Sequence, residues 1–378
     1  MNNDKKSIKI KFTDFPMGHY PDIHYDWDDN IIIRILSRHY NVEISDKPEY
    51  VIFSNYGYGF LDYDCIRIQV MLEYITPDFR LADYAIGFHS NLKYEDCYFN
   101  SYASLFYPAH LRLQKDKILN KQFFEKTDLE KKNKFAIFIH QNGGGTVRNA
   151  FFDKLSEYKE ITAAGLWKNN IGYTVKQENK NKLISESKFY FSMSNTENSP
   201  DERITEAYQN KTIPIYWGDK EIGKKFNTKG FINCHDFHDF DAVYEKIKEI
   251  DNNDDLYISM MRQPVFAEGW SFEKAEKELE EYLIYIFDQE YEKAFRRKTT
   301  PLYFLIVYEK ICKYGDKIVC RETFSEVFSA FYFMLKRIAP ILKRKFISMI
   351  MTIGKKTATY KILRWIYRRI IKKEKLPR

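Results

Sequence analysis

The stretch that decides the fold is KFYFSMSNTENSPDERITEAYQNKTIPIYWGD, from Lys188 to Asp219. It begins with an apolar run at 189–191, continues through a polar loop into a helical segment, and ends in a second apolar run at 213–217. A strand, a loop, a helix and a second strand in this order form one right-handed crossover of a parallel sheet. The loop after the first strand then lies at the carboxyl edge of the sheet, where α/β domains bind their ligands.

The start of the helix in this crossover is well signalled. Ser199 can serve as N-cap, Pro200 suits the first helical position, and Asp201 and Glu202 carry negative charge into the first turn. Arg203 follows, so a guanidinium lies beside a helix N-terminus, which is a favourable place for a diphosphate. A well-capped surface helix would have the same residues, and the pattern by itself leaves both interpretations open.

The rest of the chain predicts an open α/β architecture in two parts. Apolar runs at strand length alternate with helical or loop segments, at 8–12, 42–44, 50–53, 66–72, 84–88 and 135–140. A charged, low-complexity run at 114–134 separates the last of these from the others, and we interpret it as a solvated linker or helix between two domains.

Two further features lie just past predicted strands. Glu73 follows the strand at 66–72, which puts a carboxylate at a sheet edge, although a solvated strand-end glutamate would look the same. Gly143, Gly144 and Gly145 follow the strand at 135–140 and precede a helix predicted from Asn149 to Glu157, and such a loop lets backbone amides approach a phosphate. The glycine triplet matches neither a Walker loop nor a dinucleotide fingerprint.

Several of these segments resemble one known family. Ala207-Tyr208 and the run Ile213-Pro214-Ile215-Tyr216-Trp217-Gly218 are similar to the donor-site signature of the bacterial type of α1,3/4-fucosyltransferases, glycosyltransferase family 10. The runs at 78–88, 147–153 and 226–237 resemble the same family. The similarity covers roughly residues 65–90 and 135–265, and the first 63 residues depart from it.

The resemblance implies a GT-B fold, with two Rossmann-like domains facing across a cleft. We expect an N-terminal acceptor-side domain at 1–125, a C-terminal donor-binding domain at 126–300 and a helical basic tail at 301–378. The implied reaction is an inverting transfer of L-fucose from GDP-fucose to a hydroxyl of a GlcNAc-type or related residue in a cell-surface glycan, with α1,3 or α1,4 linkage. The family needs no metal ion and no other cofactor.

The resemblance also implies roles for particular residues. Glu73 falls where the family has its proposed general base. Arg148 and Arg203 match positions that contact the donor pyrophosphate, and Glu202 matches the residue that binds hydroxyls of the donor sugar or ribose. The loop before the signature helix adds three candidate donor contacts: Asn195, Asn198 and Ser199.

This chain departs from the family pattern at three positions. Arg203 replaces a lysine, Met193 stands where the family has asparagine, and Ser199 stands where it has tyrosine. The alternatives are therefore another GDP-linked deoxysugar as donor, or a protein that binds a glycan or a nucleic acid without catalysis.

Cysteine and histidine usage bears on compartment and metal binding. The five cysteines follow no paired spacing, and the N-terminus contains no signal-peptide core, so we expect the chain to be cytosolic. Histidine and aspartate cluster at 19–26 and at 235–239, where metal sites could be drawn. Neither cluster has helical ligand spacing, so solvated turns are the favoured interpretation.

The C-terminal segment differs in charge from the rest. Residues 331–378 contain 15 Lys or Arg and a single acid, Glu374, while the whole chain has a formal charge of only +7. The run at 359–373 places Trp and Ile on one side among basic residues, which is typical of a helix lying on an anionic membrane surface. We expect a peripheral association with the inner face of the cytoplasmic membrane rather than nucleic-acid binding, because the body is acidic.

Overall fold

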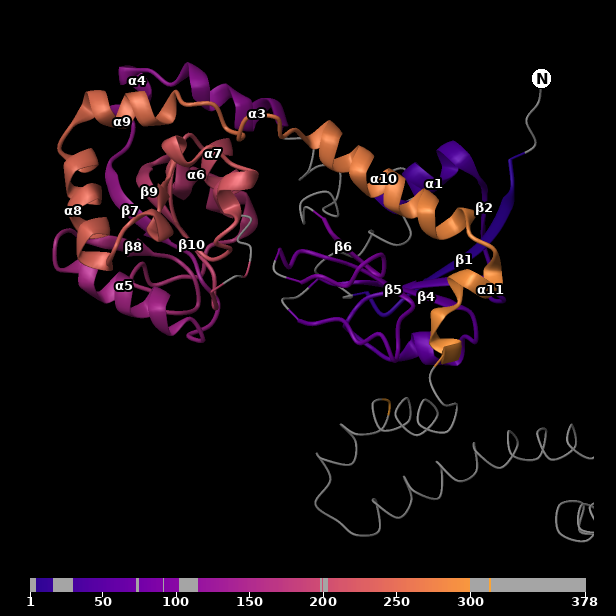
Figure 1. Cartoon of the computed structure of the whole chain (residues 1–378). Helices are drawn as coiled ribbons and strands as arrows, with labels where there is room; N and C mark the ends of the chain where they lie inside the picture. Colours follow the sequence, from indigo (N-terminus) through magenta and orange to yellow (C-terminus); the bar gives the residue numbers. More distant parts are fainter. Residues whose placement is uncertain are drawn as a thin grey trace, which may run out of the picture. The chain divides into compact units, whose positions relative to one another are not determined.

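A computed structural model describes residues 5–15, 30–72, 75–90, 92–101, 115–197, 199, 203–299 and 313. The chain divides into one compact unit at 1–299 and a second at 300–378, and nearly all described residues belong to the first. This unit contains two separate parallel sheets, each with its own helices (Figure 1). The predicted tail lies outside the described residues apart from Lys313.

The first sheet has six parallel strands in the order β2-β1-β3-β4-β5-β6. Their bounds are β1 (Ser7–Thr13), β2 (Asn41–Ile44), β3 (Tyr50–Phe53), β4 (Ile66–Val70), β5 (Tyr84–Gly87) and β6 (Tyr98–Asn100). The five strands predicted here are confirmed. The sixth, β6, was not predicted because three residues are too few to show a periodic pattern.

Helices α1 (Ile31–His39) and α10 (Phe272–Asp288) pack against each other and contribute to the core on one face of the first sheet (Figure 1). Asn30 caps α1, since its side-chain oxygen accepts hydrogen bonds from the amides of Ile32 and Ile33 at 3.0 and 3.2 Å. Helix α10 begins after Ser271, whose hydroxyl caps it by accepting a hydrogen bond from the amide of Lys274 at 3.2 Å.

The second sheet has five parallel strands in the order β11-β10-β9-β7-β8. Their bounds are β7 (Lys134–Phe138), β8 (Ile161–Ala163), β9 (Ser187–Met193), β10 (Ile213–Trp217) and β11 (Ile232–Asn233). The predicted crossover is confirmed: β9 leads to helix α7 (Arg203–Gln209) and then to β10, which pairs with β9 in parallel register. Tyr216 and Trp217 are buried in the core.

Helices cover both faces of the second sheet. Buried residues of three helices share one core cluster with the strands, from α5 (Thr146–Ser156), α8 (Phe240–Asp251) and α9 (Asp254–Met261). Ile184 of α6 (Gln177–Ser185) and Ala207 of α7 pack in a different cluster on the strands. Parallel strands buried on both faces read as continuous apolar runs, which is why β7, β9 and β10 were visible in the sequence. The strands β8 and β11, of three and two residues, were not predicted.

The segment between the sheets forms short helices, α3 (Lys115–Leu119), the 3-10 turn η3 (Asn120–Phe123) and α4 (Lys126–Leu129). The prediction of a solvated segment is wrong for its inward side. Lys121 is completely buried, and its ammonium donates to the carbonyl oxygens of Met261 and Gln263 at 3.0 and 2.6 Å. Burial lowers the pKa of Lys121 to about 7. The lysine-rich composition of this segment does not show that one of its lysines, Lys121, is buried and bonds to the carbonyl groups at the end of α9.

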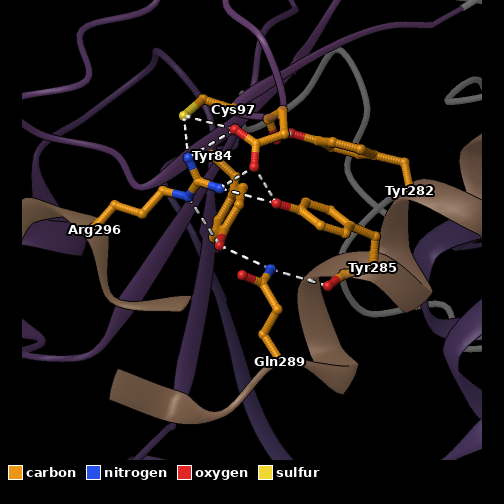
Figure 2. A network of polar contacts seen from close by, with 7 residues as sticks. Tyr84, Cys97, Tyr282, Tyr285, Gln289 and Arg296 are labelled. Carbon is orange, nitrogen blue, oxygen red and sulfur yellow. Dashed lines mark hydrogen bonds and ion pairs between the residues drawn. The ribbon is translucent and has the colours of Figure 1, made fainter. Parts of the chain in front are cut away.

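After α10, helix α11 (Tyr291–Ala294) and the 3-10 turn η7 (Arg296–Thr299) lead back onto the first sheet. Figure 2 shows Arg296 at the centre of a polar network there. Its guanidinium donates to both oxygens of Asp96, at 2.9 and 2.5 Å, and to the hydroxyl of Tyr84 at 3.2 Å. Tyr285 also donates to Asp96. The hydrogen bonds from Arg296 and Tyr285 lower the pKa of Asp96 to about 2.

The next residue, Arg297, forms a fully buried ion pair. Its Nε donates to Oδ2 of Asp83 at 2.9 Å, and its backbone amide donates to Oδ1 of the same carboxylate at 2.9 Å. A third bond joins its guanidinium to the carbonyl of Cys65 at 2.5 Å. Two consecutive arginines therefore fasten residues 296–297 to the loops around β4 and β5.

In the part of the chain that is described, no helix is long and apolar enough to cross a bilayer.

Candidate functional site

The candidate site is built at the carboxyl edge of the second sheet, where β7 and β9 end. Strand β7 continues through His140 into the loop 141–145, and α5 begins at Thr146. The first turn of α5 contains no acidic residue, so its N-terminal amides present an uncompensated positive field. Asn149 donates to the carbonyl of Gly143 at 2.8 Å, which folds the glycine loop onto the start of the helix.

Arg148 is placed at this edge by that helix start, and only 2% of it is exposed. Its guanidinium donates to the amide oxygen of Asn195 at 2.7 Å and to the carbonyl of Asn142 at 3.0 Å. A longer contact of 3.4 Å reaches the carbonyl of Met193, the last residue of β9. These bonds fix the plane of the guanidinium, so two predicted donor residues, Arg148 and Asn195, are brought into direct contact.

Gly145 explains how the arginine fits. A side-chain carbon at this position would lie 2.9 Å from Cζ of Arg148, closer than such atoms approach in proteins. The glycine therefore leaves room for the guanidinium beside the helix start. This is a close approach of a side chain to the backbone, and a bare glycine triplet in the sequence does not disclose it.

The loop that follows β9 is fixed through its backbone. The carbonyl of Ser199 accepts hydrogen bonds from the hydroxyl of Ser194 at 2.9 Å and from the amide of Asp219 at 3.0 Å. A side-chain carbon on Gly218 would lie 2.4 Å from that carbonyl oxygen, so only glycine fits. Because Gly218, the last residue of the signature run, has no side chain, the carbonyl of Ser199 can lie close to the end of β10.

Arg203 is the first described residue of α7. Desolvation of the deeply buried imidazole is the main cause that lowers the pKa of His140, and the charges of Arg203 and Arg148 lower it further. Both predicted arginines therefore act electrostatically on one histidine at the end of β7. No local motif in the sequence signals a role for His140. At neutral pH we expect the imidazole to be uncharged.

The remaining predicted site residues lie outside the described residues: Glu73, Asn198 and Glu202. The predicted cap and first turn at 200–202 are also outside, so the capping role of Ser199 stays a prediction. Glu73 follows Leu72, whose amide donates to the side-chain oxygen of Asn55 at 3.1 Å. Leu72 thus lies just past β4, at the carboxyl edge of the first sheet.

The structure describes only one of the two predicted histidine–aspartate clusters. The one at 19–26 lies outside the described residues. In the other, Asp239 caps α8 through the amide of Ala242, and the ring of His235 lies 2.9 Å from the carbonyl of Gly218. Among the described residues, no group of three or more His, Cys, Asp or Glu could hold a metal ion.

Comparison with known families decides what this edge belongs to. Residues 10–107 match the α-(1,3)-fucosyltransferase FucT N-terminal domain, and residues 129–299 match the C-terminal domain of glycosyltransferase family 10, the fucosyltransferases. The chain belongs to glycosyltransferase family 10. The first matched region covers the first sheet from residue 10 onward. The second covers the whole second sheet, with the glycine loop, Arg148 and the signature crossover, and continues through α10 and α11.

Individual relatives agree with this assignment. The chain is 31% identical over 274 residues to the α-(1,3)-fucosyltransferase FucT of Helicobacter pylori, covering 62% of this chain and 56% of that protein. A putative fucosyltransferase of Acanthamoeba polyphaga mimivirus is 30% identical over 164 residues, or 40% of this chain and 27% of the relative. The chain thus spans about half or less of the length of these relatives.

Solved structures of the family have the same fold. A crystal structure of an α1,3-fucosyltransferase with GDP-fucose superposes with a TM-score of 0.58 and 26% identity, covering 77% of this chain and 94% of the other. The same kind of enzyme with GDP gives a TM-score of 0.58 over 75% and 92%. The expected GT-B-like arrangement of two parallel α/β sheets is therefore confirmed.

Proposed function

We propose that this chain transfers L-fucose from GDP-fucose, with inversion, to a hydroxyl of a GlcNAc-type or related residue in a cell-surface glycan, in α1,3 or α1,4 linkage. The observation that carries the proposal is the placement of Arg148. It is oriented by three oxygen acceptors at the start of α5, inside the matched family region. Arg203 at the start of α7 acts on the same surroundings through its charge.

In this proposal the donor diphosphate binds between the starts of α5 and α7. Helix N-termini and guanidinium groups favour phosphate oxygens, and their attraction strengthens as the bond between the sugar and the diphosphate breaks. Glu202, Asn198 and Ser199 would contact hydroxyls of the donor. Because the two arginines and the helix ends stabilise the departing GDP, we expect transfer to need no divalent cation.

Glu73 has the role of general base. It would accept the proton of the acceptor hydroxyl while that oxygen attacks the anomeric carbon and GDP leaves from the opposite side. Such a base typically contributes a factor of about 10² to 10⁴ to the rate. The carboxyl edge of a parallel sheet is where an α/β domain presents such a group, and in the sequence Glu73 comes three residues after Val70, the last residue of β4.

The first test is donor binding, measured as thermal stability with GDP, GDP-fucose, UDP and CMP in the absence of magnesium. A ligand that binds only the folded state stabilises it, by about 2.7 kcal/mol at a hundredfold excess over its dissociation constant. GDP and GDP-fucose should raise the melting temperature, whereas UDP and CMP should not. Stabilisation by GDP without any effect of GDP-fucose would point to another GDP-linked deoxysugar as donor. A lack of response to every nucleotide would contradict the proposal.

The second test is transfer itself. The protein is incubated with GDP-fucose and N-acetyllactosamine-type acceptors in the presence of EDTA, and the anomeric configuration of the product is read by NMR. Inversion predicts a product whose anomeric configuration is opposite to that of the donor. Release of GDP that requires magnesium, or retention of configuration, would overturn the proposed mechanism.

We also propose that the basic segment 331–378 binds an anionic membrane surface, so that the enzyme is peripheral on the inner face of the cytoplasmic membrane. The support is its 15 basic residues against one acid, because each Lys or Arg near an anionic surface contributes about 1 kcal/mol. Full-length protein should sediment with vesicles containing phosphatidylglycerol but not with phosphatidylcholine alone. A protein ending before Pro340 should lose this binding. Binding to RNA that survives while vesicle binding is absent would contradict the proposal.

A further inference from the structure

The loop that follows β8, residues 164–175, exposes several large apolar side chains. Leu166, Trp167 and Tyr173 are 66%, 41% and 59% exposed. One exposed apolar side chain is ordinary on a protein surface, whereas several in one loop point to a binding site. The loop also packs against the end of β7, because the amide of Trp167 donates to the carbonyl of His140 at 3.0 Å. The exposed apolar groups therefore lie at the edge that carries the candidate site.

Two asparagines hold this loop in one conformation. The side-chain oxygen of Asn170 accepts the amide of Ala163 at 2.8 Å, and the amide of Asn170 donates to the carbonyl of Ala163 at 3.0 Å. The side chain of Asn169 donates to the carbonyls of Gly165 and Tyr173, at 2.7 and 2.9 Å. A fixed backbone thus presents the apolar side chains, so a ligand that binds them pays little to order the loop.

Trp167 is the exposed residue of this loop that lies against the glycine loop. A side-chain carbon on Gly143 would lie 2.8 to 2.9 Å from three consecutive atoms of the six-membered ring, Cζ2, Cε2 and Cη2. Nearly equal distances to three neighbouring ring atoms place Gly143 over a face of the indole and not at its edge. The indole N–H donates to the side-chain oxygen of Asn149, in the first turn of α5, at 3.1 Å. The ring is therefore held in place, and its exposed part lies on the side away from Gly143.

The guanidinium of Arg148 lies against the same short loop. It donates to the carbonyl of Asn142, the residue before Gly143, at 3.0 Å, and it packs against Gly145. Consecutive Cα atoms are only about 3.8 Å apart, so the cation and the indole are close neighbours. In a nucleoside diphosphate, one ribose separates the base from the phosphates. A diphosphate held at Arg148 therefore leaves its base within reach of Trp167.

We propose that Trp167 is the platform on which the guanine base of the donor stacks, while the diphosphate lies at Arg148. This inference rests on the proposed function, in which the donor is GDP-fucose, and it names the residue that receives the base. Stacking on an aromatic ring needs no hydrogen bond to the edge of the base, because every base has a π-face. Trp167 therefore contributes affinity for the nucleotide, and the larger face of a purine gains more from it than a pyrimidine does.

The test uses two ligands to separate the base from the phosphates. Calorimetric titration gives the dissociation constants of GDP and of inorganic pyrophosphate. Trp167→Ala should weaken GDP binding about fivefold to a hundredfold and leave pyrophosphate binding within about twofold, because pyrophosphate has no base to stack. Leu166→Ala is the matched control, since Leu166 lies on the same loop and is more exposed but has no ring. Equal weakening of both ligands by Trp167→Ala, or equal weakening of GDP by the two variants, would overturn the inference.

Two conservative variants distinguish the aromatic face from the hydrogen bond to Asn149. Trp167→Phe keeps a ring but loses the N–H, and it should bind GDP within about threefold of wild type. Trp167→Leu keeps an apolar side chain without a π-face, and it should bind GDP as weakly as Trp167→Ala. If Trp167→Phe is as weak as Trp167→Ala, the residue acts by holding Asn149 at the start of α5, and the stacking role is wrong.

Fluorescence and kinetics give independent readouts. GDP should quench indole fluorescence in wild-type protein, and Trp167→Phe should lose this quenching. In transfer assays Trp167→Ala should raise KM for GDP-fucose and change kcat little, because a stacked base is bound equally in the ground state and the transition state. A loss of kcat at unchanged KM for GDP-fucose would contradict the stacking role, as would a change confined to KM for the acceptor.

Failure of this inference and failure of the proposed function give different results. If wild-type protein binds GDP and Trp167→Ala binds it equally well, the stacking role alone is wrong. If wild-type protein binds no GDP, the donor assignment and the stacking role are both wrong.

Discussion

At the carboxyl edges of both sheets, oxygen atoms of the loops accept hydrogen bonds, but the groups that they hold differ. At the first edge, the side chains of Asp14 and Asn55 accept backbone amides, and the held object is a stretch of main chain. At the second edge, carbonyl and amide oxygens of Asn142, Met193 and Asn195 accept from Arg148, and the held object is a cation. The first edge thus fixes main chain, and the second fixes a guanidinium group.

The difference predicts that mutations at the two edges affect different steps. The largest expected effect is at the first edge. Glu73→Gln should lower kcat about 10²- to 10⁴-fold, the contribution of a general base, while stabilisation by GDP remains as in wild type. Steady-state kinetics and thermal shift with GDP measure the two quantities. The matched control is Glu43→Gln, at an exposed position of β2 in the same sheet.

Two outcomes would contradict the assignment of catalysis to the first edge and donor binding to the second. One is a loss of GDP stabilisation in Glu73→Gln, and the other is a kcat of that variant within threefold of wild type. In the first case Glu73 would contribute to donor binding, and in the second the base would have to be sought elsewhere.

The next effect is at the second edge. Arg148→Lys keeps the charge but cannot reproduce the fork of contacts to Asn195 and Asn142, so we expect GDP to bind about tenfold to a hundredfold more weakly, with a smaller change in kcat. Calorimetric titration with GDP gives the dissociation constant. Arg262→Lys is the control. Among the described residues the side chain of Arg262 donates to one carbonyl, that of Phe124, away from the glycine loop and Asn195. Equal weakening by both variants would indicate a general loss of structure.

A smaller effect involves one histidine at each edge. Burial and the charges of Arg203 and Arg148 lower the pKa of His140, whereas at His89 the charge of Asp219 opposes the lowering by burial. A group whose folded pKa lies below its unfolded value of 6.5 binds protons more readily when unfolded. Stability is therefore lost as pH falls below about 6.5, by at most about 2 kcal/mol at pH 5 for one histidine.

His140→Val should accordingly reduce the difference in unfolding free energy between pH 7.5 and pH 5, and His89→Val should reduce it less. Urea denaturation at the two pH values measures this difference. A larger effect at His89 would show that burial and the two arginine charges together do not lower the pKa of His140 more than the pKa of His89 is lowered.

The smallest effect is expected from restoring a lysine. Arg203 stands where the family pattern has lysine, so Arg203→Lys should change the dissociation constant of GDP by no more than about threefold, against tenfold or more for Arg148→Lys. The same titration measures both variants. If Arg203→Lys is as damaging as Arg148→Lys, the phosphate contacts of this chain have been rearranged around the arginine.

Much of the fold could be predicted because its strands are short apolar runs between polar segments. The bounds predicted for β3 and β10 agree with the structure, and the crossover from β9 to β10 was visible in the pattern. Contacts between distant parts of the chain could not be predicted. Arg297 and Asp83 are 214 residues apart, and nothing near either residue signals that they pair.

The candidate site was predictable in part for the same reason. Arg148 follows a glycine loop after a strand, which is a local pattern. Asp14 and Asn55 meet the backbone amides that they accept only because three neighbouring strands bring their loops together, so no local pattern marks them. The inward side of 114–134 was misjudged because a charged composition conceals a single buried lysine, Lys121.

The pair of arginines at 296–297 has a consequence for how the family can vary. Removing one partner of a buried ion pair costs about 3 to 5 kcal/mol, so the body of the protein is complete only when the chain continues through Arg297. From residue 300 onward the chain forms a separate unit. The chain just after Arg297 is therefore a natural point at which C-terminal segments can be exchanged. A different segment can be joined there, during evolution or in the laboratory, while both sheets keep their cores.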